Sequence, residues 1–128
     1  SSIYGMLGYF KLLRNDDLDE TTKLCEEAYD YNSDDRDIKD NLSICYFRKG
    51  EYEKAEKISD ELVGSAPNFV EGFYHGIQIA MKLNKYDKAA EYAEKLKECK
   101  RSGMTTVTEE EVNKLIQEVK NHNENTIG

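Results

Sequence analysis

The side chains that most often carry chemistry in proteins are sparse in this sequence. It has two histidines, His75 and His122, and three cysteines at positions 25, 45 and 99, none of them in a Cys-x-x-Cys pair. A zinc ion needs three or four ligands that converge on it, and no cluster of histidine, cysteine and acidic residues has a suitable spacing. We therefore expect no metal site, and we expect His75 to be a packed or groove-lining side chain.

Catalytic motifs are equally scarce. The glycines stand singly, so there is no phosphate-binding loop, and no serine, cysteine or lysine is flanked by a recognisable base motif. Acidic clusters occur at 34–35 and 109–111, where carboxylates favour the positive ends of helix dipoles. The sequence predicts a protein that is not an enzyme and uses no cofactor. The enzyme alternative would need a closed pocket around Asp37, Asp40 and His75.

Acidic residues dominate the first third of the chain. The 128 residues suffice for one domain and carry a net charge of −8, and residues 15–40 hold eleven acids against three bases. An acidic surface repels phosphate groups, so we expect neither nucleic acid nor an anionic membrane as a partner. A basic segment of another protein suits this charge better. The same acids would also serve as a solvated helix face, and the sequence leaves both interpretations open.

The sequence shows no sign of membrane insertion or export. No stretch approaches the roughly 20 apolar residues that span a bilayer, and the N-terminus lacks a basic region followed by an apolar run. Three cysteines cannot all pair with one another, which suits a reducing compartment. We therefore expect a cytoplasmic protein whose thiols are small buried groups.

Helix-favouring residues fill the sequence, and no segment shows the alternation of a strand. The predicted helices span 3–13, 18–31, 36–49, 52–63, 69–83, 86–100 and 106–120. The polar run at 32–35 supplies a helix cap, Gly50 a left-handed helix end, and Thr108 with Glu111 a capping box. Residues 121–128 have nothing to bury and are expected to fray.

A repeat organises these helices. The motif Tyr52-Glu53-Lys54-Ala55 recurs as Tyr86-Asp87-Lys88-Ala89, 34 positions later, and Leu62 and Leu96 share the same offset. A period of about 34 residues built from paired helices is the spacing of tetratricopeptide repeats. The sequence resembles that family from about residue 3 to residue 120, most strongly over 41–99.

The resemblance implies an all-α, right-handed superhelix that forms a single domain over 3–120. Three helix pairs at about 3–33, 36–67 and 70–101 would be closed by the helix at about 106–120. In that family the first helix of each pair lines a concave groove, and the resemblance assigns its lining to Met6, Phe10, Asp37, Asp40, Asn41, Ile44, Phe47, Glu71, Tyr74, His75 and Gln78. The apolar row of the first pair either lines this groove or packs against another part of the chain.

One subclass of the family, found in co-chaperones and immunophilins, grips the acidic C-terminal tail of heat-shock chaperones. Its clamp positions correspond here to Met6, Phe10, Asn41, Glu71 and His75, of which only Asn41 matches. Glu71 would repel the carboxylates of such a tail.

The leading hypothesis is therefore a non-catalytic scaffold or adaptor that docks an apolar and basic segment of a partner protein. A receptor for the chaperone tail is the first alternative. An organelle-membrane adaptor resembling the mitochondrial fission adaptor is the second, although this sequence shows no membrane anchor.

Overall fold

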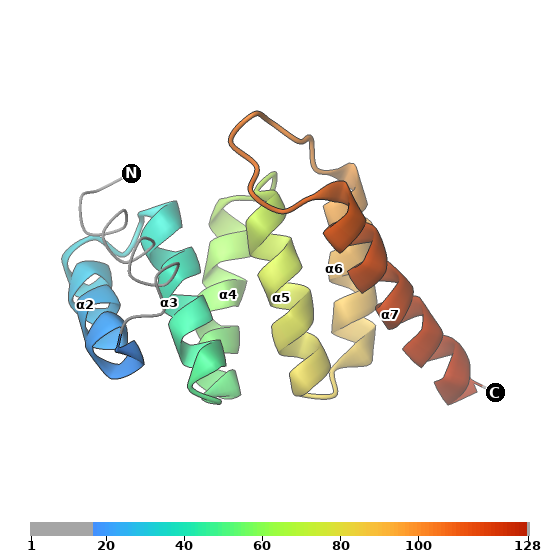
Figure 1. Ribbon diagram of the computed structural model, residues 1–128, viewed down its shortest axis with the longest axis horizontal. Helices are drawn as coiled ribbons and strands as arrows, with labels where there is room; N and C mark the ends of the chain where they lie inside the picture. Colours follow the sequence, from blue (N-terminus) through green and yellow to red (C-terminus); the bar gives the residue numbers. More distant parts are fainter. Residues whose placement is uncertain (1–16, 128) are drawn as a thin grey trace.

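The computed structural model describes residues 17–127, and over this range all regular structure is helical. The helices are α2 (Leu18–Tyr31), α3 (Arg36–Arg48), α4 (Tyr52–Ser65), α5 (Val70–Lys82), α6 (Tyr86–Glu98) and α7 (Glu109–Ile127). They stand side by side in chain order and form one elongated row (Figure 1). The helix expected at 3–13, with Met6 and Phe10, lies outside the described residues.

The three predicted capping signals are confirmed. Asp35 caps α3, and its Oδ1 accepts hydrogen bonds of 2.9 and 3.0 Å from two backbone amides of the first turn. Gly50 follows α3 with a φ of 79°, a value that glycine adopts without steric cost. Before α7, the Thr108 amide donates to Glu111 Oε1 and the Glu111 amide donates to Thr108 Oγ1, each at 3.1 Å. These local signals explain why the helix boundaries can be read from the sequence.

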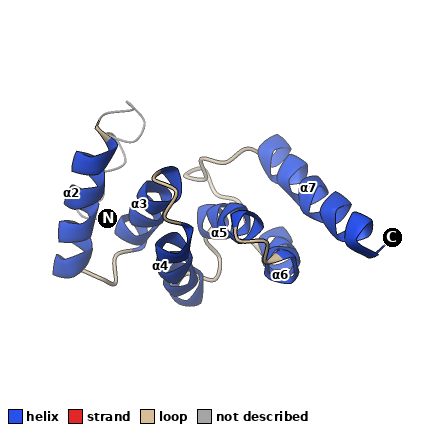
Figure 2. Ribbon diagram, turned by 90° about the horizontal axis from the view of Figure 1, so that it is seen from below, coloured by secondary structure: helices blue, strands red, loops and turns tan. Residues whose placement is uncertain are grey.

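The helices form two layers. Figure 2 shows α3, α5 and α7 on one side of the row, with α4 and α6 on the other. Helix α3 also contacts α5 directly, and α5 contacts α7, although neither pair is consecutive in the chain. We call the side formed by α3, α5 and α7 the inner face and the side formed by α4 and α6 the outer face. The expected all-α stack of helix pairs is confirmed.

Two apolar clusters hold the row together. The larger joins α5, α6 and α7, and in it Phe73 meets Tyr92 edge-on, with ring centroids 5.6 Å apart and an interplanar angle of 80°. The smaller joins α2, α3 and α4 and is built on Cys25, Leu42, Cys45 and Ile58. Each cluster is shared by three helices, so no helix pair buries its apolar surface alone.

Helix α7 is longer than expected. It continues to Ile127, whereas the sequence predicts that the helix ends at residue 120 and that the chain frays beyond it. The His122 ring stacks on Tyr86 at the start of α6, with centroids 3.6 Å apart. Gln117 Nε2 also donates a 2.8 Å hydrogen bond to Asn121 Oδ1. His122, beyond the predicted end of the helix, therefore has a packing partner on α6 that the sequence pattern does not reveal.

Gly76 marks the closest approach of α4 and α6 to α5. A Cβ atom at Gly76 would lie 3.0 Å from Tyr92 Cδ2 and 3.1 Å from Ser59 Oγ. We expect Gly76→Val to lower the free energy of unfolding by about 1–3 kcal/mol, because extra carbons in a packed core force its neighbours apart. Urea denaturation measures this change.

Gly64→Ala is the matched control, because a Cβ at Gly64 meets nothing within 4 Å. Alanine in this helix should leave the free energy of unfolding unchanged or raise it by about 0.5–1 kcal/mol. Equal effects of the two substitutions would contradict the close packing at Gly76.

Candidate functional site

A carboxylate–imidazole pair joins α3 to α5 on the inner face. His75 Nδ1 lies 2.7 Å from Asp40 Oδ1, and the two side chains are 21% and 12% exposed. Because an ionised carboxylate can only accept a hydrogen bond, the Nδ1–H group of His75 is the donor. Asp40 and His75 were both expected to line the groove, but the sequence did not predict that their side chains contact each other. The repeat contains the signal for it, since the 34-residue offset from Asp40 falls on Tyr74, the neighbour of His75.

Glu71 lies one helical turn before His75 and is half-buried. Burial raises the pKa of its carboxyl, and the Asp40 carboxylate adds to this effect, while His75 opposes it. The Glu71 side chain also accepts a hydrogen bond from the backbone amide of Thr106, in the loop between α6 and α7. This end of the inner face thus holds two carboxylates and one imidazole with little access to water.

The surroundings of His75 decide its charge. Burial disfavours the imidazolium, but the charge and hydrogen bond of Asp40, together with the charge of Glu71, outweigh that effect and raise the pKa of His75. Arg48 acts in the opposite direction. His75 therefore stays positively charged to a higher pH than a free histidine does.

Helix α7 adds two further acids to the inner face. The pKa of Tyr74 is raised by burial and then by the charges of Glu111 and Glu118 on α7, and α7 packs directly against α5. The sequence analysis missed these two residues as site candidates. Glu111 already had a role in the capping box, and no motif in the sequence ties α7 to α5. We call Asp40, Glu71, Glu111 and Glu118 the inner-face acids.

Three other predicted residues lie on the same helices. Ile44 of α3 and Gln78 of α5 are half-buried, which leaves each of them able to contact a ligand. Asn41 is 3% exposed, so its side chain belongs to the packing of α3 rather than to an accessible surface. The expected clamp asparagine is therefore present in the sequence but is covered in the structure.

Two predicted residues have other interactions. Asp37 is at the start of α3, one turn before Asp40, where it forms a 3.4 Å ion pair with Arg36. Phe47 is at the opposite end of the helix, with its ring 5.5 Å from that of Tyr52 at the start of α4. Phe47 therefore lies away from the pair formed by Asp40 and His75.

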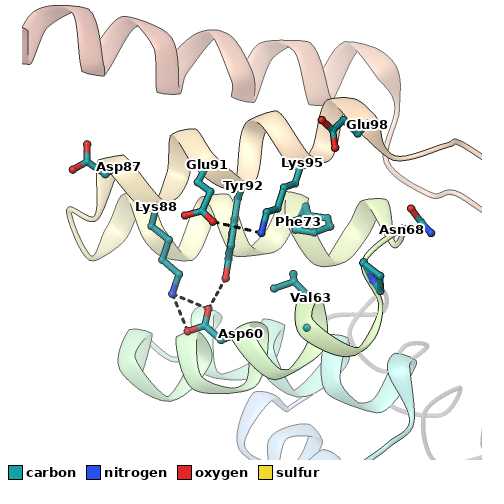
Figure 3. Close-up of a pocket in the computed structure, with 12 residues that line it drawn as sticks. Asp60, Val63, Asn68, Phe73, Asp87, Lys88, Glu91, Tyr92, Lys95 and Glu98 are labelled. Carbon is teal, nitrogen blue, oxygen red and sulfur yellow. Dashed lines mark hydrogen bonds and ion pairs between the residues drawn. The ribbon is translucent and has the colours of Figure 1, made fainter.

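A separate hollow of about 780 Å³ lies on the outer face between α4 and α6. Figure 3 shows Asp60 at its wall, where it accepts 2.8 Å hydrogen bonds from the Tyr92 hydroxyl and from Lys88 Nζ. Lys95 lies 3.4 Å from Glu91, one turn earlier on the same helix α6. Both lysines are thus paired with acids of the chain, and the contacts of Lys88 and Tyr92 with Asp60 serve the stacking of α6 on α4.

Over residues 17–127, no three histidine, cysteine or acidic side chains are arranged to hold a metal ion. Within that same range, none of the helices combines the length and apolar character needed to cross a bilayer.

Residues 12–72, a little under half of the chain, match the sequence pattern of the tetratricopeptide repeat (TPR) family. That match covers α2, α3 and α4, and the remaining helices continue the same pairing. The fold is that of a TPR domain. No curated protein matches the sequence.

Solved TPR structures share this arrangement over nearly the whole chain. The Sgt2 TPR domain from Aspergillus fumigatus has a TM-score of 0.81 and 16% identity, covering 96% of this chain and 78% of its own. The first TPR domain of Spaghetti (RPAP3), bound to the HSP90 peptide SRMEEVD, has a TM-score of 0.78 and 14% identity, covering 94% and 90%. The MamA RS-1 ArsTM double mutant has a TM-score of 0.74 and 15% identity, covering 96% and 65%. At these identities the likeness establishes the fold.

The raised pKa of His75 makes the stability of this TPR domain depend on pH. Because the folded-state pKa lies above the ordinary value of 6.5, the imidazolium stabilises the fold fully below that value, and the contribution is lost as the pH rises through the folded-state pKa. We expect the free energy of unfolding in urea to fall over this window, and Asp40→Asn to remove most of the fall.

Asp37→Asn is the control for this measurement, since it removes an acid of the same helix that does not contact His75. It should leave the fall in stability intact. NMR titration of the imidazole gives the pKa of His75 directly. If the pKa of His75 in the unaltered chain lies below about 6.5, the Asp40 carboxylate does not outweigh burial, and the expected pH dependence is contradicted.

Proposed function

We propose that the inner face of this TPR domain docks a segment of a partner protein, and that this segment presents lysine or arginine side chains next to an apolar residue. The observation that carries the proposal is the gathering of the four inner-face acids, two near Tyr74 and two near His75. Cationic side chains complement these carboxylates, and the half-buried tyrosine offers an apolar surface with a polar tip. The domain would act without catalysis, as an adaptor or scaffold in a larger assembly.

The charge balance of the inner face supports a cationic ligand. Asp40 and Glu71 share one nearby imidazolium, and the pKa of Glu71 is still raised. A raised carboxyl pKa means that the negative charge is insufficiently stabilised by its surroundings. A positive side chain from a ligand would supply the missing stabilisation, and Glu111 and Glu118 would draw such a ligand toward α5.

An acidic chaperone tail fits the same face less well. The RPAP3 domain holds the peptide SRMEEVD, so the fold is able to present a site for such a tail. In this chain Asn41 is buried, Glu71 is an acid, and His75 is paired with Asp40. An acidic peptide would therefore meet carboxylates of its own sign.

A pair of peptides separates the two hypotheses. The first is SRMEEVD, and the second is the same sequence with its three acids replaced by lysine and its C-terminus amidated. We expect the lysine peptide to bind more tightly by at least about tenfold at low salt, a difference of ~1.4 kcal/mol, and to weaken as salt is added. Calorimetric titration measures both affinities. Tighter binding of SRMEEVD would overturn the cationic-ligand proposal in favour of a chaperone-tail receptor.

Substitutions on α7 and α5 locate the binding surface. Glu118 is exposed, so Glu118→Lys should not disturb the fold, and it should weaken the lysine peptide by about threefold to tenfold through charge repulsion. Glu98→Lys on α6 changes the net charge equally, away from the inner face, and should leave the affinity unchanged. Tyr74→Ala should weaken binding at every salt concentration while the helical circular dichroism signal is retained. Equal losses from Glu118→Lys and Glu98→Lys would show that only net charge matters.

A further inference from the structure

Two thiols face each other inside the smaller apolar cluster. Cys25 of α2 and Cys45 of α3 are 3% and 0% exposed, and their Sγ atoms are 3.9 Å apart. The third cysteine, Cys99, is only half-buried and lies at the end of α6. A disulfide has an S–S distance of about 2.05 Å, so Cys25 and Cys45 need a sulfur displacement of roughly 2 Å to bond. Each thiol therefore has one other sulfur within immediate reach.

The two thiols are not equivalent. The contact between the two Sγ atoms lowers the pKa of Cys45, and the Thr22 hydroxyl acts in the same direction, whereas burial opposes them. The charges of Arg48 and Lys49 also favour a Cys45 thiolate. Cys25 has the opposite tendency, since its contact with Cys45 and its burial both raise its pKa. The positive charges of Arg48 and Lys49 therefore favour Cys45 as the attacking thiol, whereas the charge of Glu26 disfavours a thiolate at Cys25.

We propose that Cys25 and Cys45 are a modification site that takes hydrogen peroxide as its oxidant and forms a reversible disulfide, which fastens α2 to α3. The bond would close a loop between residues 20 positions apart. A crosslink of this kind restricts the unfolded chain and so stabilises the folded one. It would hold α2, the first helix of the described range, in place on the helix that carries Asp40.

The chemistry balances in two steps. Cys45 Sγ attacks one oxygen of the peroxide, the O–O bond breaks, and the departing hydroxide takes up the thiol proton as water, leaving a sulfenic acid on Cys45. Cys25 Sγ then attacks the Cys45 sulfur, the S–O bond breaks, and the hydroxide leaves with the Cys25 proton as a second water. Two thiols have lost two hydrogens, and the peroxide has gained them.

Burial determines which oxidant reaches the pair. Hydrogen peroxide is close to water in size, so we expect it to reach the pair, and we expect a bulky disulfide reagent to be excluded from thiols that are 3% and 0% exposed. The neighbouring thiol at 3.9 Å also captures the sulfenic acid before a second peroxide arrives. The half-buried Cys99 has no described thiol beside it and remains open to larger reagents.

The test uses the Cys99→Ser variant of the chain, so that only the proposed pair remains. The folded protein is treated with hydrogen peroxide, then denatured and alkylated, and its intact mass is measured. We expect the loss of two hydrogens and no alkylation, with full alkylation restored by dithiothreitol. The proposal would be overturned if both thiols of the Cys99→Ser variant stayed free under a peroxide treatment strong enough to oxidise Cys99 in the unaltered chain.

Two controls complete the experiment. The double variants Cys25→Ser/Cys99→Ser and Cys45→Ser/Cys99→Ser each lack one partner, so neither should form the intramolecular bond under the same treatment. Oxidised Cys99→Ser should also unfold at a temperature higher by about 10 °C than its reduced form. A lower unfolding temperature after oxidation would mean that the bond strains the fold, and this would overturn the fastening of α2 to α3.

Discussion

The apolar face that each helix pair leaves open must be covered by the next helix, and the rest of the structure depends on this requirement. Helix α5 illustrates it, because Ile77 is fully buried and Gly76 leaves room for both α4 and α6. Helix α7 covers the last open face with Leu115 and Val119. The same stacking sets α3, α5 and α7 beside one another, so the inner face is a consequence of how the core is buried.

Polar links recur across the stack, with their acids and lysines at equivalent positions of the repeat and their tyrosines at different ones. Asp60 of α4 accepts hydrogen bonds from Tyr92 and Lys88 of α6. One repeat earlier, Glu26 of α2 accepts a 2.7 Å hydrogen bond from the Tyr46 hydroxyl, and Lys54 lies over the same tyrosine ring. Glu26 and Asp60 are 34 residues apart, as are Lys54 and Lys88. Each boundary between pairs is thus bound by a buried apolar contact and by an acid that receives a tyrosine hydroxyl.

Local signals such as capping residues predicted most of the fold. The features that the sequence did not predict depend on contacts between residues that are far apart in the chain. The caps at Asp35 and Thr108 act within one helical turn, so the sequence alone reveals them. The contact of His122 with Tyr86, and that of Asp40 with His75, join residues at least 35 positions apart. The repeat period places such residues on neighbouring helices, but it does not tell which side chains meet. For the same reason Glu118 could not be assigned to the inner face from the sequence.

The half-buried Glu71 carboxylate opposes the stability that the stacking provides, because burial and the charge of Asp40 raise its pKa. A fold optimised for stability alone would not crowd Asp40 and Glu71 around one imidazole, because like charges in a poorly solvated site destabilise it. Residues that cost stability where the core does not need them are commonly the ones that bind. A cationic ligand would relieve the repulsion, lower the pKa of Glu71 and stabilise the folded chain in proportion to its affinity. Binding and folding would then be linked through the same carboxylates.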